Sequence, residues 1–232
     1  MQTASYTTRR GELETYFDRT ASEAWAKLTS DAPVSGIRAT VRAGRDAMRE
    51  TLLNWLPEDL SGRRILDAGC GAGQMSLALA ERGADVVAID LAETLVGLAK
   101  ERTEKLSVPG SIDFRVGDMT DPALGEFDHV VAMDSLIHYG AGDLVAMLDT
   151  FLPRATRSVV FTFAPRTPLL SAMHAAGKLF PKSDRSPAIQ PIGKASLSQR
   201  LTQTLGDDWQ LGRNRRIKSG FYISHALEVT QG

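Results

Sequence analysis

The sequence is poor in cysteine and contains no long apolar run. Its single cysteine, Cys70, excludes an intrachain disulfide and favours a reducing compartment. No stretch approaches the roughly 18 apolar residues of a membrane-spanning helix. The first residues also lack an apolar segment of the signal-peptide type. We therefore expect a cytoplasmic protein, for which a peripheral contact with a membrane stays open.

The chain also lacks an excess of either charge. Its 27 Lys and Arg residues nearly balance 28 Asp and Glu residues, giving a net charge of −1. A chain without a strong positive field is not expected to bind nucleic acid through its overall charge. With 232 residues, of which 43% are hydrophobic, it is long enough for one core and a small appended part.

Helical and strand-like segments follow one another in a regular order. Residues 10–57 have a helical period that is interrupted near Pro33 and Gly36 and ends at Pro57. From residue 63 to residue 164, short apolar runs alternate with helical segments, which predicts a parallel sheet with helices on both faces. The expected strands are 63–68, 85–90, 112–118, 127–134 and 158–164, and the expected helices between them are 73–83, 92–106 and 142–153.

The end of the chain predicts a closing antiparallel hairpin. A short helix at 195–206 precedes two strand-like runs, 209–219 and 221–231, which are separated around Gly220. Such a hairpin on a parallel sheet is the usual ending of the class I methyltransferase architecture. We therefore predict an α/β, Rossmann-like fold with a seven-stranded, mostly parallel sheet. We divide the chain into a helical arm (1–60), a cofactor-binding core (61–164), a small lid (165–195) and the C-terminal part of the sheet (196–232).

A glycine-rich loop follows the first expected strand. In "ILDAGCGAGQ", residues 65–74, Asp67 ends the strand and Gly69, Gly71 and Gly73 follow. Glycines allow a positive φ and a close approach of the backbone to a ligand, and the next helix points its N-terminal amides at that ligand. Because dinucleotide enzymes use a similar loop, the glycines alone are weak evidence.

Three aspartates favour S-adenosylmethionine as the ligand. The loop lacks the third glycine of the GxGxxG pattern, and Asp67 could hold an ammonium group but would repel a pyrophosphate. Asp90 ends the next strand, where a carboxylate can bind two ribose hydroxyls. Asp118 follows the third strand and could accept a hydrogen bond from an adenine amino group. A nicotinamide or flavin nucleotide is the alternative cofactor, and a plain strand–helix turn is the structural alternative.

Further residues are assigned to the same site by their positions. Arg42 is a candidate for the methionine carboxylate, although a surface arginine is an equal possibility. Three more candidates stand beside the aspartates or after the fourth strand, namely Leu91, Met119 and Asp134. Cys70 is expected to be a small filler in the loop.

The segment 165–195 differs from the rest of the chain. It holds five of the ten prolines, and five Lys or Arg residues against one acid. We interpret it as a small lid that could close over a bound ligand. A solvated basic loop is the alternative.

The chain resembles the magnesium-protoporphyrin IX O-methyltransferase family. The resemblance is carried by "IRATVRAGRDAMRETLLNWL", "ILDAGCGAG", "MDSLIHY", "APRTPLL…GKLFPKSDRSP" and "FYISHALEV", and it covers nearly the whole chain. It implies methyl transfer from S-adenosylmethionine to a propionate of magnesium protoporphyrin IX, giving a monomethyl ester in (bacterio)chlorophyll synthesis. It also implies a possible contact with the large subunit of magnesium chelatase and with a photosynthetic membrane. The magnesium belongs to the substrate, because no cluster with metal-ligand spacing is present.

Within this resemblance two residues become candidates for catalysis. His138, in "SLIHY", could orient the propionate or act as a base. Tyr16 could donate a hydrogen bond to it. Four cations of the lid could pair with the second propionate, namely Arg166, Lys178, Lys182 and Arg185.

A purely structural role is the alternative for each of these residues. His138 could cap a helix, and Tyr16 could pack beside Phe17. His129 and His225 are expected to be structural, and His174 to face solvent. The alternative function is a class I O- or N-methyltransferase for a small phenol, amine or quinone precursor, and a non-enzymatic S-adenosylmethionine-binding module is a more distant one.

Overall fold

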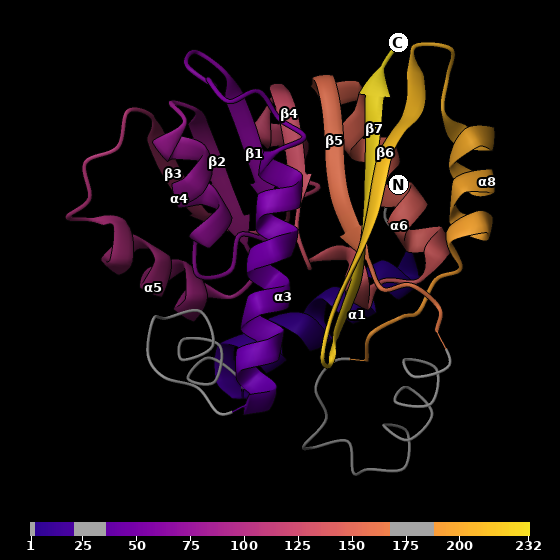
Figure 1. The fold of residues 1–232 in the computed structure, drawn as a ribbon, viewed down its shortest axis with the longest axis horizontal. Helices are drawn as coiled ribbons and strands as arrows, with labels where there is room; N and C mark the ends of the chain where they lie inside the picture. The colour runs from indigo at the N-terminus through magenta and orange to yellow at the C-terminus, as the bar shows by residue number, and fades with distance from the viewer. Residues whose placement is uncertain (1–2, 21–35, 168–187) are drawn as a thin grey trace.

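Seven strands form one sheet at the centre of the protein (Figure 1). The computed structural model describes residues 3–20, 36–167 and 188–232. The strand order is β3-β2-β1-β4-β5-β7-β6. The first five strands of this order are parallel, whereas β7 is antiparallel to both β5 and β6. The predicted α/β fold, mostly parallel with a closing antiparallel hairpin, is confirmed.

The bounds of the strands agree closely with the apolar runs of the sequence. They are β1 (Arg64–Ala68), β2 (Asp85–Asp90), β3 (Ser111–Val116), β4 (Phe127–Ala132), β5 (Ala155–Phe163), β6 (Trp209–Ser219) and β7 (Tyr222–Gln231). The predicted fourth strand is two residues too long, because the chain turns sharply after Ala132.

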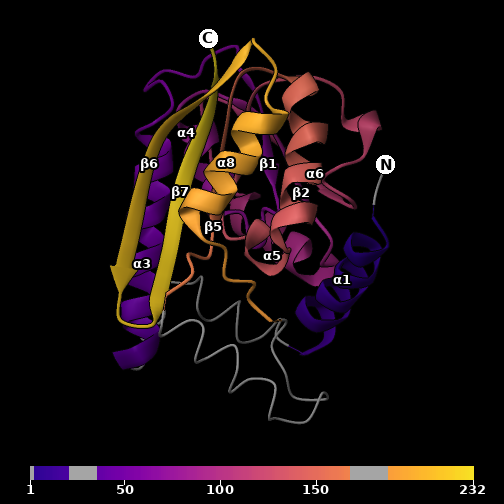
Figure 2. The ribbon, with the colours of Figure 1, turned by 90° about the vertical axis from the view of Figure 1, so that its right-hand side faces the viewer.

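Helices cover both faces of the sheet. The α-helices are α1 (Ala4–Thr15), α3 (Gly36–Leu53), α4 (Gln74–Glu81), α5 (Glu93–Thr103), α6 (Ala141–Phe151) and α8 (Lys194–Thr204). A π-helical segment, η1 (Tyr16–Thr20), continues α1, and short 3-10 turns include η3 (Leu136–His138). Figure 2 shows α3 and α4 on one side of the sheet, and α1, α6 and α8 on the other.

The alternation of side chains along the parallel strands explains the two layers. Leu66 belongs to the buried cluster that includes residues of α6 and α8, whereas its neighbour Ile65 belongs to the cluster that includes Met48 and Leu52 of α3. All four of these side chains are fully buried. Strands that bury both faces need continuous apolar sequence, which the runs found in the sequence provide.

The N-terminal helix begins earlier than the sequence predicts. The helical period suggests a start near residue 10, but α1 begins at Ala4, where the side chain of Thr3 accepts the backbone N–H of Tyr6 at 3.0 Å. A threonine in this position satisfies one of the unpaired amides of the first turn, and it is the signal that the periodicity alone misses.

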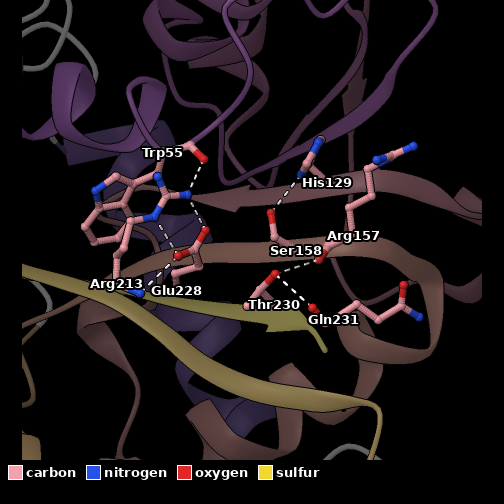
Figure 3. Close-up of polar contacts among 8 residues, drawn as sticks. All are labelled: Trp55, His129, Arg157, Ser158, Arg213, Glu228, Thr230 and Gln231. Carbon is pink, nitrogen blue, oxygen red and sulfur yellow. Dashed lines mark hydrogen bonds and ion pairs between the residues drawn. The ribbon is translucent and has the colours of Figure 1, made fainter.

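An ion pair between an exposed arginine and a buried glutamate connects the C-terminal hairpin to the residues after α3 (Figure 3). Arg213 on β6 donates to both carboxylate oxygens of Glu228 on β7, at 2.8 and 2.6 Å, and also to the carbonyl of Trp55. Glu228 is buried, which by itself raises its pKa, but the hydrogen bonds from Arg213 outweigh burial and hold that pKa below its ordinary value. The hairpin is therefore fixed relative to α3.

The two strand histidines lie within the sheet. The ring of His129 shares a hydrogen bond of 2.7 Å between Nδ1 and the Ser158 hydroxyl (Figure 3). Burial lowers the pKa of His129 to about 4. His225 stacks on Phe163 with 5.1 Å between the ring centroids. These surroundings agree with the structural role expected for both.

Candidate active site

One cavity lies at the carboxyl ends of the parallel strands β1, β2 and β4. Its volume is ≈1010 Å³, including the open mouth. Its described walls come from the glycine loop, the residues that follow β2, β3 and β4, the end of the N-terminal helical segment and one side of α3. Ligands of open α/β sheets bind in such a crevice, at the point where neighbouring strands lead to opposite sides.

The glycine loop has the backbone geometry that only glycine adopts readily. Gly69 has a φ of 84°, and a β-carbon there would lie 2.3 Å from the Cβ of Ser135. Gly71 has a φ of 51° and nothing within 4 Å of the place of a β-carbon, so that it leaves open space at the cavity wall. Gly73 precedes α4 and does not line the cavity. Cys70 lines it, and burial raises the pKa of its thiol.

Asp67 is a buried carboxylate in the wall of this cavity. It is 1% exposed and accepts a hydrogen bond from the Ser76 hydroxyl at 2.5 Å. Burial raises its pKa to about 7, because desolvation outweighs the hydrogen bond from Ser76. A positively charged ligand group beside Asp67 would restore the ionised form.

Asp90 is the last residue of β2, the strand beside β1, and its carboxylate binds the backbone of the glycine loop. Its Oδ2 accepts the backbone N–H of Gly71 at 2.8 Å, and its Oδ1 accepts that of Ala92 at 3.0 Å. Burial raises the pKa of Asp90, although these N–H groups act in the other direction. Each oxygen of a carboxylate can accept more than one hydrogen bond, so the group suits a vicinal diol. The next residue, Leu91, also lines the cavity.

The third predicted aspartate is held by the N-terminal helix. Asp118 accepts hydrogen bonds from the Tyr6 hydroxyl at 2.7 Å and from Arg10 at 2.8 Å. Burial alone would raise its pKa, but the hydrogen bonds from Tyr6, Thr120 and Arg10 hold it below the ordinary value. Met119 lines the cavity, whereas Asp118 does not. No local pattern predicts that Tyr6 and Arg10 contact Asp118, because both are more than 100 residues away along the chain.

Asp134 is the centre of a network at the end of β4. Its φ is 57°, the only positive φ of a residue other than glycine in the described part of the chain. Its carboxylate accepts the Tyr222 hydroxyl at 3.0 Å and forms an ion pair with Arg45 at 3.1 Å. Its backbone N–H donates to the Thr162 hydroxyl at 2.7 Å. Strain of this kind collects at functional sites, where surrounding contacts hold it in place.

Two arginines of α3 line the cavity, and neither is the predicted one. Arg45 and Arg49 are in the wall, whereas Arg42 is half-buried and lies one turn earlier. The signal was in the sequence, because residues 38, 42, 45 and 49 are all arginine and share one side of a helix. Only the packing of α3 shows which of them reach the cavity.

The turn after β4 places two ring residues in the wall. His138 and Tyr139 both line the cavity. The ring of His138 meets the edge of Phe17 at 5.8 Å, and the ring of Tyr139 stacks on Tyr6 at 5.3 Å. Tyr16 is half-buried, meets Phe17 edge to face and is not among the lining residues. Phe17, which the sequence analysis treated as a packing partner, is the residue of this pair in the wall.

Comparison with known proteins gives the family. The chain is 48% identical over 226 residues to the magnesium-protoporphyrin O-methyltransferase of Rhodobacter capsulatus, covering 97% of this chain and 98% of the relative. The chain belongs to the magnesium-protoporphyrin O-methyltransferase family. Residues 132–231 match the family model of the magnesium-protoporphyrin IX methyltransferase C-terminus, and residues 65–154 match a general methyltransferase domain.

A solved structure of the same family has the same fold. The magnesium protoporphyrin IX methyltransferase of Synechocystis, crystallised with bound SAH, is 28% identical, with a TM-score of 0.82, and the match covers 96% of this chain and 99% of that one. The likeness to quinone enzymes is shorter. The ubiquinone biosynthesis O-methyltransferase of Dechloromonas aromatica is 37% identical over 91 residues, 37% of this chain. The family match extends over the cavity and the C-terminal part alike.

The predicted lid, residues 165–195, lies mostly outside the described residues. Of its predicted substrate-binding cations, Arg166 is exposed, and its backbone N–H donates to the carbonyl of Ile192 at 2.9 Å. Lys178, Lys182 and Arg185, like His174, lie outside the described residues. Among the residues that are described, no group of three or more His, Cys, Asp or Glu side chains could hold a metal ion.

Proposed function

We propose that this protein transfers the methyl group of S-adenosylmethionine to one propionate carboxylate of magnesium protoporphyrin IX and yields the monomethyl ester, a step of (bacterio)chlorophyll biosynthesis. The observation that carries the proposal is the match along nearly the whole chain to a relative with this activity in its name. The cavity supports it with buried carboxylates at the places that such a methyl donor requires.

The residues of the cavity fit the parts of the methyl donor. Asp67 would hold its ammonium group, and Asp90 its ribose hydroxyls, because these carboxylates lie at the ends of neighbouring strands. Arg45 and Arg49 would face its carboxylate. Asp118 is not in the cavity wall, but it adjoins Met119, which is, and we propose its Oδ2, the oxygen that Arg10 also contacts, as the acceptor for the adenine amino group. Leu91 and Met119 would flank the adenine.

S-Adenosylmethionine supplies an electrophilic methyl group on a sulfonium. The acceptor, a propionate, has an ordinary pKa of ~4.3 and is already an anion near neutral pH. The protein therefore has little need of a strong base. Its task is to hold one carboxylate oxygen in line with the methyl group and to keep water away.

His138 and Tyr16 are the residues that we propose for this task. His138 lies in the cavity wall at the end of η3 and can donate a hydrogen bond to one propionate oxygen, which leaves the other oxygen to attack. Tyr16 adjoins Phe17, which packs against His138, and this neighbourhood is why we propose the tyrosine hydroxyl as a second donor to the same carboxylate.

Methylation of a porphyrin and of a smaller acceptor can be distinguished directly. Purified protein should convert magnesium protoporphyrin IX to a monoester and stop there, since a ring held in one plane presents one propionate to the methyl group. Protoporphyrin without magnesium, and a catechol-type quinone precursor, serve as competing acceptors. Substantial diester, or preference for the quinone precursor, would show that the porphyrin assignment is wrong.

Two contacts with other components, the magnesium chelatase and a membrane, are also proposals. In the described residues no helix is both long and apolar enough to cross a bilayer. We propose that the protein takes up its substrate from the large subunit of magnesium chelatase and touches the photosynthetic membrane peripherally. Co-sedimentation of the purified protein with that subunit, with and without bound porphyrin, tests the first contact. We also propose that residues 165–195 act as the lid over the acceptor.

A further inference from the structure

Two large apolar side chains are exposed at the end of the molecule where the parallel strands have their carboxyl ends. Ile37, in the first turn of α3, is 61% exposed, and Phe221, in the turn between β6 and β7, is 49% exposed. Figures 1 and 2 both show this turn beside the start of α3. The contact is close, since a β-carbon on Gly220 would lie 2.3 Å from the Thr40 hydroxyl oxygen. Single exposed apolar residues are common, but a pair at this end of the molecule suggests a ligand.

Positive charge lies near this apolar pair in the sequence. Residues 36–42 and 216–222 contain four Lys or Arg residues and no Asp or Glu. On α3, Arg38 and Arg42 belong to the same stripe as Arg45 and Arg49, which line the cavity. Arg38 is exposed and Arg42 is half-buried. At ~1.5 Å per residue, Arg38 lies ~10 Å along the helix axis from Arg45. The stripe of arginines thus extends from the cavity to the N-terminal end of α3.

Two contacts connect the apolar pair and the stripe to the reaction centre. Phe221 is followed by Tyr222, whose hydroxyl donates to Asp134 in the cavity wall at 3.0 Å. Arg42 stands one turn before Arg45, which pairs with the same aspartate at 3.1 Å. The surface formed by Ile37, Arg38, Arg42 and Phe221, here named the ledge, is therefore continuous with the site that would hold the methyl donor.

We infer that the ledge binds the part of the acceptor that does not react. This inference rests on the proposed function. The acceptor is a flat apolar ring with two carboxylates on neighbouring pyrroles, one of which must lie at His138. Ile37 and Phe221 contact the ring face, and Arg38 and Arg42 pair with the carboxylate that stays unmethylated. Guanidinium groups suit this because they bind carboxylates with two parallel hydrogen bonds. The second carboxylate is then held by α3 and not by the cations of the lid.

The test compares two double variants that each remove two positive charges. The variant Arg38→Ala/Arg42→Ala changes the ledge. The variant Lys100→Ala/Lys105→Ala changes the last turn of α5 and the residues after it, which do not line the cavity, and serves as the control. The ledge variant should raise the KM for magnesium protoporphyrin by about tenfold, the equivalent of 1.4 kcal/mol. The KM for S-adenosylmethionine, and kcat at saturating porphyrin, should stay at the wild-type values. The control should match the wild type in all three.

A binding measurement without methyl transfer adds a second readout. Quenching of tryptophan fluorescence reports the affinity for the monomethyl and the dimethyl ester of magnesium protoporphyrin. The wild type should prefer the monoester, whose free carboxylate can reach the ledge, and the ledge variant should lose that preference. Arg38→Lys/Arg42→Lys should restore part of it, and Ile37→Ser/Phe221→Ser should weaken both ligands equally. Circular dichroism shows that each variant is folded.

Several results would overturn the inference. An unchanged porphyrin KM in the ledge variant, together with a raised KM in Arg166→Ala/Lys178→Ala, would assign the second carboxylate to the lid. A raised KM for S-adenosylmethionine would assign Arg42 to the methionine carboxylate. Binding to vesicles of anionic phospholipid that the ledge variant alone loses, with normal porphyrin kinetics, would make the ledge a lipid contact. If the wild type neither methylates nor binds the porphyrin, the proposed function fails and the ledge with it. Normal wild-type activity with no effect of the ledge variants removes only the ledge.

Discussion

Gly44 of α3 packs directly against the ring of Tyr222 on β7. A β-carbon on Gly44 would lie 2.5 Å from the Cδ1 atom of Tyr222 and 2.8 Å from its Cγ. Neither the helix nor the strand can yield easily, because the ion pair of Arg213 and Glu228 and the buried side chains of α3 fix both. The hydroxyl of the same tyrosine reaches Asp134. Because position 44 lacks a side chain, Tyr222 can approach α3 closely, and its hydroxyl then holds Asp134 in the cavity wall.

Replacement of this glycine should cost stability and activity together. We expect Gly44→Ala to lower the free energy of unfolding by about 1–3 kcal/mol, since the added methyl group overpacks the contact. Turnover should fall as Tyr222 moves away from Asp134. Gly97→Ala, in α5, is the matched control, because a β-carbon there meets nothing within 4 Å and helix propensity favours alanine by ~1 kcal/mol. Urea denaturation measures the free energy of unfolding of the two variants. A Gly44→Ala protein as stable as Gly97→Ala would contradict the predicted overpacking.

The affinity for S-adenosylmethionine should depend on pH through Asp67. The pKa of Asp67 in the protein without ligand is about 7, above the ordinary 3.8, so the carboxyl is largely neutral at pH 6 and ionised at pH 8. An ammonium group binds the ionised form. Affinity should therefore rise with pH through about 7, by up to ~10-fold per unit below it, and binding should release a proton at pH 6 but not at pH 8.5.

Calorimetry in two buffers of different ionisation enthalpy measures this proton release. Asp67→Asn should bind more weakly and lose the pH dependence, because the amide does not titrate. Its stability should also vary less between pH 4 and pH 8, since a raised folded-state pKa makes the wild type less stable as pH rises through that range. Equal wild-type affinity at pH 6 and pH 8.5 would exclude Asp67 as the partner of the ammonium group.

Loss of the Asp90 carboxylate should weaken cofactor binding. Asp90→Ala removes the carboxylate that we propose as the partner of both ribose hydroxyls, and we expect a loss on the order of 1.5–3 kcal/mol in the free energy of binding. Asp90 also accepts the N–H of Gly71, so the variant needs a check of its fold by circular dichroism. Asp90→Asn, which keeps an acceptor oxygen, should lose less. A folded Asp90→Ala protein with unchanged affinity by calorimetry would end the assignment of the cofactor site.

His138 should affect turnover and not cofactor binding. We expect His138→Ala to keep its affinity for S-adenosylmethionine and to lose turnover by ~10²-fold or more, the usual size for a positioned hydrogen-bonding or acid–base group. If the imidazole only orients the anion, His138→Asn or His138→Gln restores part of the rate and the pH profile keeps its shape. If it is a base, the wild-type rate rises through the ordinary histidine range, ~6.5, and the variant lacks this limb. Near-normal turnover in His138→Ala removes the residue from the mechanism.

The sequence alone determined the order of the elements and the position of the cofactor loop. The bounds of β2 and β6 coincide with the predicted runs 85–90 and 209–219. Such predictions succeed because a buried strand and a positive φ each depend on the residue types in a short stretch of sequence. A parallel sheet covered on both sides needs continuous apolar runs, and the positive φ of Gly69 and Gly71 needs glycine wherever the chain lies.

Only the tertiary structure decided which side chains meet. Tyr6 reaches Asp118 across 112 residues of sequence, and Tyr222 reaches Asp134 across 88. No local pattern contains such a pair. The same holds for neighbours on one helix, since Arg42 and Arg45 have the same chemistry and one turn of separation, but only Arg45 lines the cavity. The periodicity of α3 gives the stripe of arginines, and the packing of Gly44 against Tyr222 sets the rotation of the helix that turns Arg45 and Arg49 into the site.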